Sequence, residues 1–347
     1  MFSFFLYFSI LLIASSSAYI AQYGNNFSLR ISARFICFFS MFIPAALRTT
    51  GTDLGNYMLI YEKQFPDNLQ QMEIGFKYLG IFCYKLNFPA HLFIVTVAAI
   101  TYWILCFNIP RRFIFLIIIF YNLMFCYLDS YNLIRQYLAI SFLLYGIILY
   151  FNKKELRGLI SILFATSIHI SSAVGLLIIL FSNIRMNNYF RIIVVLLLII
   201  ALPVFLPEII GLFAFFLPRV SGILTTVLIR PSFNTGLSML IYATIPLLVM
   251  LSNKDIIREY NIKKGNFIVN CNFFYLNIVA FGTFGMNFFR LHAALVSIPL
   301  FSIPILLNCN KKYRDIIFFP FLFFCIMFFL RWINRPGADL LYVSVFR

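Results

Sequence analysis

Short polar clusters interrupt the long apolar runs of this sequence, and they hold the residues that could do chemistry. The first is RTTGTDLGNY, residues 48–57. Gly51 permits a tight turn, Arg48 is of a type that binds phosphate through two N–H groups, and Asp53 is of a type that acts as a general base. The alternative is a purely structural helix start, with Asp53 or Thr52 as the N-cap.

The second cluster is DSYNLIRQYLA, residues 129–139. It places Arg135 and Gln136 at the start of an apolar run. An arginine inside a lipid-embedded helix costs at least about 2.5 kcal/mol unless it is paired or reaches the interface. Asp129 is the partner that this stretch offers. The alternative is an arginine that only anchors the helix end at the interface.

The third cluster is TSIHISS, residues 166–172, the most polar patch within any apolar run. His169 could be a catalytic base or a sugar ligand, or a hydrogen-bonded packing residue. The other histidines, His91 and His292, offer no ligand spacing with it, so no metal site is expected. No phosphate-binding Walker loop, dinucleotide fingerprint, H-E-x-x-H or G-x-S-x-G motif occurs either, so no cofactor is expected.

Three further charged residues stand out by their position. Arg290 interrupts NFFRLHAALV between two apolar runs, where it could cap a hairpin or face a lumen. Arg230 lies beside a proline in a long apolar loop and is a weaker candidate. Glu73 opens EIGFKYLGIFCYKL, which predicts a short interfacial helix with Glu73 and Lys77 paired at i,i+4.

Composition defines the scaffold that must position these clusters. Hydrophobic residues make up 63% of the 347 and charged residues only 11%, whereas a soluble domain has about 25% charged residues. Apolar runs near the length of about 20 residues that spans a bilayer recur from end to end, and they lack the alternation of barrel strands. The formal charge of +16 is scattered between the runs, so a nucleic-acid surface is excluded. The seven cysteines have no C-x-x-C spacing, and neither a metal site nor a disulfide framework is indicated.

We therefore predict an all-α polytopic integral membrane protein with about eleven transmembrane helices. It forms a single transmembrane domain, residues 1–347, with extracytoplasmic loops at about 48–89 and 207–236. The predicted spans are 2–20, 34–47, 88–108, 113–129, 134–151, 158–181, 191–206, 237–252, 271–289, 291–307 and 316–330. Because no Lys or Arg precedes Arg30, we expect a retained first span rather than a signal peptide.

Orientation depends on the span that contains His169. If every run crosses once, lysine and arginine show no bias between the two sides. If the chain breaks near His169 and returns, most of the basic clusters fall on one side, which would then be cytoplasmic. Those clusters are Arg30/Arg34, Arg111/Arg112, Lys153/Lys154/Arg157, Arg185/Arg191, Lys254/Arg258/Lys263/Lys264 and Lys311/Lys312/Arg314. We therefore predict one broken, re-entrant helix near His169.

In order and spacing, four stretches resemble the EpsG-like bacterial polysaccharide polymerases, which are related in role to Wzy-type O-antigen and capsule polymerases. They are RTTGTDLGNY, EIGFKYL, the long segment from IRQYLA to IHISSA, and FFRLHAALVSIPL, which together cover about residues 48–300. The family pattern runs Phe-His where this chain has Ile168 before His169. The matching residues are Arg48, Gly51, Thr52, Asp53, Tyr57, Glu73, Gly75, Phe76, Arg135, Gln136, Leu138, Ala139, His169 and Arg290.

The resemblance implies an oligosaccharide repeat-unit polymerase in the bacterial cytoplasmic (inner) membrane. At the outer face it would transfer a growing glycan from undecaprenyl pyrophosphate to the next lipid-linked repeat unit. Its partners would be these lipid-linked oligosaccharides and the bilayer, with a chain-length regulator and a flippase nearby. The catalytic candidates are Asp53 and His169. The pyrophosphate and glycan ligands would come from Arg48, Tyr57, Glu73, Arg135, Gln136, Arg230 and Arg290.

Two other functions fit the same sequence. A lipid-linked oligosaccharide flippase would also place arginines in a lumen and use broken helices. A membrane acyltransferase that decorates the same glycan would favour His169 as a base.

Overall fold

The computed structural model describes residues 2–51, 53–63, 72–181, parts of 184–197, 238–282, 295–309, 318–334 and 341–344. Over these ranges the chain is helical, and the single strand-like feature is a β-bridge between Arg48 and Ser344. The all-α class is therefore confirmed. The chain divides into two compact units, Met1–Leu176 with Ile316–Arg347, and Leu177–Asp315.

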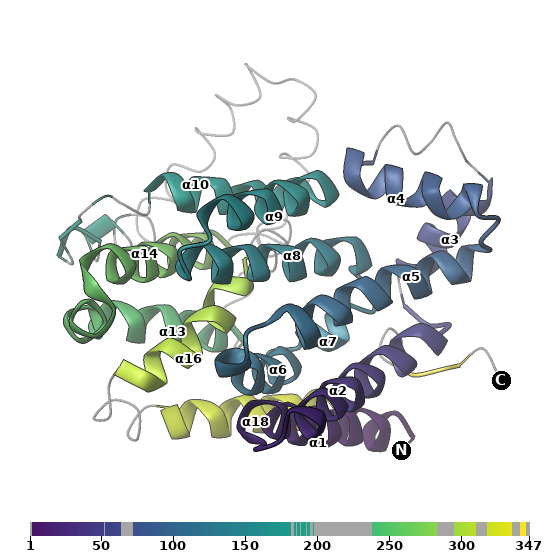
Figure 1. The fold of residues 1–347 in the computed structure, drawn as a ribbon, viewed down its shortest axis with the longest axis horizontal. Coiled ribbons are helices and arrows are strands. Elements are labelled where there is room, and N and C mark those ends of the chain that lie inside the picture. The colour runs from purple at the N-terminus through teal and green to yellow at the C-terminus, as the bar shows by residue number, and fades with distance from the viewer. Residues whose placement is uncertain are drawn as a thin grey trace. The chain divides into compact units, whose positions relative to one another are not determined.

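The first unit contains the N-terminal helices and the last one (Figure 1). Within it, α1 packs against α2 and α6, α2 packs against α5, and α8 packs against α9. Its elements, with α10 running into the second unit, are α1 Phe2–Tyr23, α2 Phe27–Leu47, α3 Leu54–Lys63, α4 Ile74–Lys85, α5 Ala90–Trp103, η2 Ile104–Asn108, η3 Arg111–Phe113, α6 Ile114–Leu123, α7 Cys126–Asp129, α8 Ile134–Phe151, α9 Glu155–Ile168, η4 Ile170–Ala173, α10 Val174–Phe181 and α18 Phe319–Asn334.

Four described helices are long and apolar enough to cross a membrane: Phe2–Tyr23, Phe27–Leu47, Ala90–Asn108 and Ile134–Phe151. Each overlaps a predicted span, although the second helix begins at Phe27, well before the predicted start at residue 34. Shorter apolar helices occur at Ile170–Leu180, Ile241–Leu251, Ser297–Cys309 and Phe319–Asn334. The polytopic helical membrane protein is thus confirmed, while the number of eleven spans stays a prediction.

The predicted continuous span 113–129 is wrong as a single helix. α6 ends at Leu123, and α7 begins only at Cys126. Phe125 between them has φ 66°, a left-handed conformation that a helix cannot contain. The chain therefore turns here, and α7 leads into the turn before α8.

The predicted break at His169 is present. α9 ends at Ile168, His169 is extended (φ −149°, ψ 118°), and a short 3₁₀ turn precedes α10. A Cβ on Gly175 would lie 2.9 Å from the Ile162 side chain and 2.5 Å from that of Leu143. Since thirteen residues of straight helix would separate Gly175 from Ile162 by about 20 Å, the chain reverses at His169.

α8 and α9 form a close antiparallel pair, and their register decides where the polar residues lie (Figure 1). The pair is tight enough that a Cβ on Gly158 would lie 2.8 Å from Gly146 O; small residues allow such close approach between membrane helices. Further along, Ser161 Oγ donates to Phe142 O at 2.8 Å. In this register, the end of α9 lies beside the beginning of α8.

Arginines gather at the other end of α8. Arg112 donates to Asn152 Oδ1, just beyond the last residue of α8. Arg111 donates to Gln22 O (2.6 Å) at the end of α1, and Arg34 donates to Cys106 O (2.7 Å) at the end of η2. Arg111 and Arg34 thereby satisfy backbone carbonyls that helix ends leave free. We call this end of the first unit the basic end.

The second unit consists of α13 Ser238–Leu251, α14 Asn253–Gly282 and α16 Ser297–Cys309, together with described parts of 184–197. α14 packs against both α13 and α16. Asn272 Nδ2 donates to Ser302 Oγ at 2.7 Å, which joins α14 to α16. The predicted span 271–289 begins within α14, which starts at Asn253 and is kinked at Asn261.

Candidate functional site

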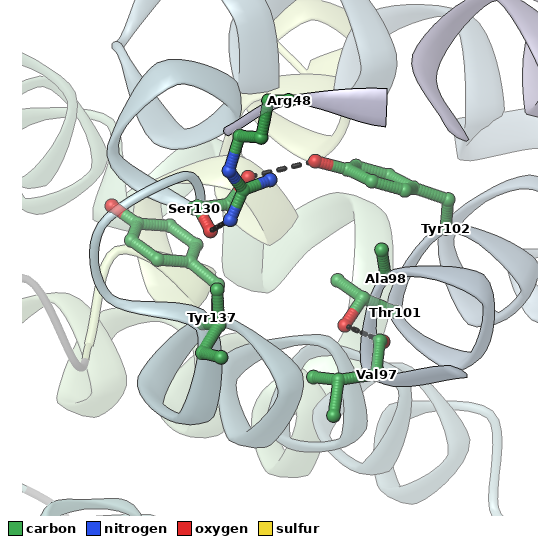
Figure 2. A pocket seen from close by; sticks show the side chains of 8 residues that line it. Arg48, Val97, Ala98, Thr101, Tyr102, Ser130 and Tyr137 are labelled. Atoms are coloured by element: carbon green, nitrogen blue, oxygen red, sulfur yellow. Dashed lines mark hydrogen bonds between the residues drawn. The ribbon is translucent and has the colours of Figure 1, made fainter. Parts of the chain in front are cut away.

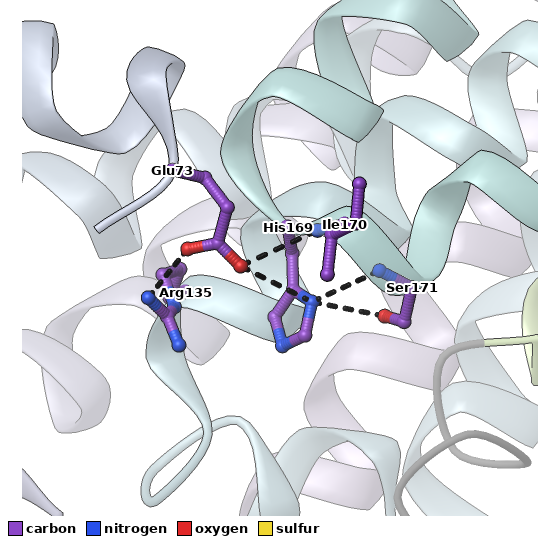
Figure 3. Close-up of polar contacts among 5 residues, drawn as sticks. All are labelled: Glu73, Arg135, His169, Ile170 and Ser171. Carbon is purple, nitrogen blue, oxygen red and sulfur yellow. Dashed lines mark hydrogen bonds and ion pairs between the residues drawn. The ribbon is translucent and has the colours of Figure 1, made fainter. Parts of the chain in front are cut away.

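Three polar side chains from three separate sequence clusters meet where α8 begins and α9 ends (Figure 3). Glu73 Oε2 accepts a hydrogen bond from Arg135 Nη1 at 2.6 Å. Glu73 Oε1 lies 3.8 Å from His169 Nδ1 and accepts from the Ile170 N–H at 3.3 Å. Ser171 Oγ lies 2.9 Å from His169 Nδ1. We call these residues the Glu73 cluster.

The Glu73 cluster is open on one side. The side chains of Arg135, Glu73 and His169 are 23%, 21% and 20% exposed. Glu73 occupies one nitrogen of the Arg135 guanidinium, and the buried Nε of Arg135 has no partner among the described residues. A guanidinium presents five N–H donors, so Arg135 keeps donors for a bound anion.

Two predicted ion pairs are wrong. Glu73 was expected to pair with Lys77 one turn along its own helix, but its carboxylate contacts Arg135 and His169. Asp129 was the expected partner of Arg135, but its carboxylate accepts from Tyr137 OH at 3.3 Å. In both cases a contact across elements replaces one that local sequence spacing suggested.

Glu73 reaches the cluster because Gly75 lets α4 approach the end of α9. α4 begins at Ile74, one residue after the predicted start, with Glu73 in the extended N-cap position. A Cβ on Gly75 would lie 2.3 Å from Ser167 Oγ and 2.9 Å from the Ser167 backbone. Because no side chain fits in this space, the glycine of the EIGFKYL motif positions the glutamate.

Arg48 lies in a second polar environment, beside a small cavity lined by Thr101, Tyr102, Ser130 and Tyr137 (Figure 2). The cavity has room for about one water molecule. Arg48 is 1% exposed, and its Nε has no partner among the described residues. Burial lowers the pKa of the guanidinium, an effect that nearby tyrosines oppose.

The bonds of Arg48 tie three segments together. Nη1 donates to Ala45 O (3.0 Å), and Nη2 donates to Tyr131 O (2.7 Å). The guanidinium also lies 4.3 Å from the centre of the Tyr131 ring, within cation–π range. The neighbouring Thr49 N–H donates to Val343 O near the C-terminus at 2.8 Å. Arg48 thus holds the end of α2 against the turn that precedes Arg135, and its predicted binding of pyrophosphate stays a prediction.

The first and second sequence clusters also meet. Gly51 has φ 147°, and a Cβ there would lie 3.0 Å from Asn132 Oδ1, so this turn requires glycine. Asp53 directly precedes α3, which is the predicted N-cap position. The Tyr57 ring packs edge-on against Phe76 of α4, with centroids 6.0 Å apart. These contacts tie the first cluster to the second and to the helix that follows Glu73.

The other residues that the sequence predicted for the site are either buried or lie outside the described residues. Gln136 is buried in α8, 4% exposed. Arg230, Arg290, the loop at 207–236 and most of the predicted span 191–206 lie outside the described residues. Two contacts were not predicted from the sequence: that of Ser171 with His169, and the pairing of Val343 with Thr49. The polar run TSIHISS carried a signal for Ser171, whereas nothing near Thr49 points to residues almost 300 positions away.

The Glu73 cluster combines a partly free guanidinium, a carboxylate that orients it, and an imidazole, beside a reversal of the chain. This set can hold a phosphate-type anion and hydrogen-bond a second group close to it. The EpsG family model matches residues 31–344, which include the whole cluster. No curated protein and no solved structure shows significant similarity. The family match covers nearly the whole sequence, and the chain belongs to the EpsG family.

Proposed function

We propose that this polymerase-type membrane protein of polysaccharide biosynthesis joins lipid-linked oligosaccharide repeat units at the outer face of the bacterial cytoplasmic membrane. The growing glycan leaves undecaprenyl pyrophosphate and is transferred to the next lipid-linked repeat unit. The observation that carries the proposal is the Arg135–Glu73 pair beside His169. A chain-length regulator and a flippase would act next to it.

The reaction makes defined chemical demands. A hydroxyl of the acceptor repeat unit attacks the anomeric carbon of the donor glycan, and the bond from that carbon to the pyrophosphate oxygen breaks. The electron pair goes to the pyrophosphate, which leaves on its lipid, and the hydroxyl proton goes to a base. Fixed cations and N–H donors stabilise the leaving group, and a carboxylate or an imidazole accepts the proton.

The residues of the first unit fit these demands. Arg135 keeps unoccupied donors for pyrophosphate, while Glu73 orients the guanidinium. The base is Asp53 or His169. Arg48 is a further proposed pyrophosphate ligand, with Tyr57 and Gln136 on the glycan side. Arg230 and Arg290 belong to the second unit and lie outside the described residues, and their role as pyrophosphate ligands stays a prediction from the sequence. The proposed reaction uses side chains alone and includes no metal or cofactor.

The position of the Glu73 cluster supports an extracytoplasmic reaction. Arg135 stands at the first turn of α8, and Asn152, at the basic end, follows its last residue. An α-helix of 18 residues is about 27 Å long, close to the thickness of a hydrocarbon core. Because arginine and lysine favour the cytoplasmic side, the basic end is cytoplasmic and the Glu73 cluster faces outward.

The direct test uses the purified protein in liposomes with a lipid-linked repeat unit as its only substrate. We expect glycans of two or more repeats from the wild type, and a loss of about 100-fold or more in rate for Arg135→Ala. Arg157→Ala is the matched control, because Arg157 is exposed near the other end of α9. Equal rates for Arg135→Ala and the wild type would show that Arg135 is not part of the functional site.

A deletion strain separates the proposal from its rivals. Loss of a polymerase leaves single repeat units at the cell surface. Loss of a flippase traps the repeat units inside the cell, and loss of an acyltransferase keeps the polymer but changes its decoration. Either of the last two results would overturn the proposed reaction.

A further inference from the structure

The turn that joins α8 to α9 at the basic end has a lysine where glycine is usual. Lys153 has a left-handed φ of 64°. Its N–H donates to Tyr150 O, and the N–H of Lys154 donates to Leu149 O, both at 3.0 Å. This is the Schellman closure of a helix, in which the left-handed position favours glycine because a Cβ costs free energy there. A lysine in this position indicates that its side chain has a role of its own.

Three further cations lie close to Lys153. Lys154 is the next residue, Arg157 lies in the first turn of α9, and Arg112 donates to the side chain of the C-cap residue of α8. All four side chains are exposed, and none of them takes part in an ion pair among the described residues. Glu155 is the only carboxylate in this stretch of sequence. We call Arg112, Lys153, Lys154 and Arg157 the basic turn, and it carries a clear excess of positive charge.

An apolar surface begins beside the basic turn. Leu156, Ile160 and Leu163 are 70%, 57% and 49% exposed, and their spacing of four and three residues places them along one face of α9. The opposite face packs on α8, where Ile162 is fully buried and a Cβ on Gly146 would lie 2.7 Å from its side chain. The exposed face of α9 therefore adjoins the basic turn at one end.

We propose that the basic turn binds the phosphate of an anionic phospholipid, whose acyl chains lie along Leu156, Ile160 and Leu163. Ammonium and guanidinium groups form charged hydrogen bonds with phosphate oxygens, and basic residues that follow a membrane helix attract anionic lipids of the cytoplasmic leaflet. Free phosphate would account for the cations alone, whereas a lipid also accounts for the adjoining apolar face. The site lies at the opposite end of α8 from the Glu73 cluster, so it does not depend on the proposed reaction.

The lipid headgroup then affects the stability of the α8–α9 pair. The left-handed Lys153 and the repulsion among neighbouring cations both oppose folding of the turn. A ligand that binds only the folded protein raises its stability. An anionic headgroup therefore offsets both costs, whereas a zwitterionic headgroup, which has no net charge, leaves them in place.

The binding test uses the purified full-length protein in mixed micelles, in which phosphatidylglycerol replaces phosphatidylcholine at constant total lipid. We expect Tm to rise with phosphatidylglycerol, and to rise less at about 1 M salt, which screens the attraction. In Lys153→Gln/Lys154→Gln the apparent affinity for phosphatidylglycerol should fall about 30-fold. Lys77→Gln/Lys85→Gln removes two charges from α4 instead and should respond like the wild type.

Three results would overturn the proposal. They are an equal response to phosphatidylglycerol in the two double variants, the same rise in Tm with phosphatidylcholine alone, and the same rise with inorganic phosphate in place of phosphatidylglycerol. The last result would show a site for a free anion, because inorganic phosphate has no acyl chains.

Lys153→Gly tests the left-handed lysine even if the double variant does not fold. Glycine adopts this backbone conformation without the cost of a Cβ, so Tm without anionic lipid should equal or exceed that of the wild type. The apparent affinity for phosphatidylglycerol should nevertheless fall about fivefold, because one cation is lost. A lower Tm without anionic lipid, or an undiminished affinity, would show that the Lys153 side chain is not a lipid ligand and would overturn the proposal.

Discussion

Glu73 and Arg135 lie 62 residues apart in the sequence, yet their side chains meet at 2.6 Å. The contact joins the N-cap of α4 to the first turn of α8. It gives the partly buried Arg135 a carboxylate partner that also contacts His169. The pair therefore orients the two groups that the proposed reaction needs, in addition to compensating a charge near the membrane.

Glu73→Gln separates these two roles. Partly exposed ion pairs contribute at most about 1 kcal/mol to stability, so we expect thermal unfolding in detergent to change little. We expect the rate of glycan lengthening to fall at least tenfold, because the Arg135 guanidinium loses the charge that orients it. Glu155→Gln is the control, since this exposed carboxylate lies at the other end of α9. A large loss of stability with unchanged turnover in the folded fraction would reduce Glu73 to a structural role.

The local sequence pattern correctly predicted two features around the Glu73 cluster. The polar run around His169 predicted the break in the helix, because serine and histidine interrupt an otherwise apolar span. The motif EIGFKYL predicted a helix from Glu73, and the helix begins one residue later, at Ile74. Both features depend on short stretches of chain, where residue type acts directly on backbone conformation.

Contacts across elements were harder to predict. Glu73 was assigned to Lys77 because a helix pattern reveals only neighbours within the same helix, three or four residues apart. Its real partner depends on the register of α8 and α9 and on the space at Gly75. The turn at Phe125 was not predicted, because nothing in an apolar run indicates that a phenylalanine has a left-handed backbone conformation. Each of these features is set by packing between helices.

Two glycines provide a matched pair of substitutions. Gly75→Ala places a methyl group 2.3 Å from Ser167 Oγ and 2.9 Å from the Ser167 backbone, so α4 must move away from α9. We expect a loss of glycan lengthening similar to that of Glu73→Gln, or greater. Gly55→Ala adds a methyl group with nothing within 4 Å, and alanine favours a helix by about 1 kcal/mol over glycine.

The test compares the rate of glycan lengthening and the unfolding temperature of the two glycine variants. Gly55→Ala should unfold at the same or a higher temperature and keep its rate. Adding Ser167→Ala to Gly75→Ala should restore little, because the Ser167 backbone remains too close. Full activity in Gly75→Ala would show that the approach of α4 to α9 is not needed for the reaction.

Arg48 should behave as a structural residue as well as a candidate ligand. Lysine has a single ammonium and cannot reach Ala45 O and Tyr131 O with the geometry of a guanidinium. We expect Arg48→Lys to lower the free energy of unfolding by about 2–4 kcal/mol, because buried carbonyls lose charged donors. Calorimetry in detergent measures this, with Arg135→Ala as the more stable comparison. An unchanged stability with a raised KM for the lipid-linked substrate would favour direct binding instead.

The orientation of the first unit can be measured in whole cells with a membrane-impermeant maleimide. Lys85 is exposed at the end of α4, before α5 runs toward the basic end, and Lys154 is exposed beside Asn152. We expect Lys85→Cys to be labelled in intact cells and Lys154→Cys only after permeabilisation, because arginines collect on the cytoplasmic side. The parent protein gives the background, since six of its seven cysteines are buried. The reverse pattern would place the Glu73 cluster in the cytoplasm, where it could not join repeat units at the outer face.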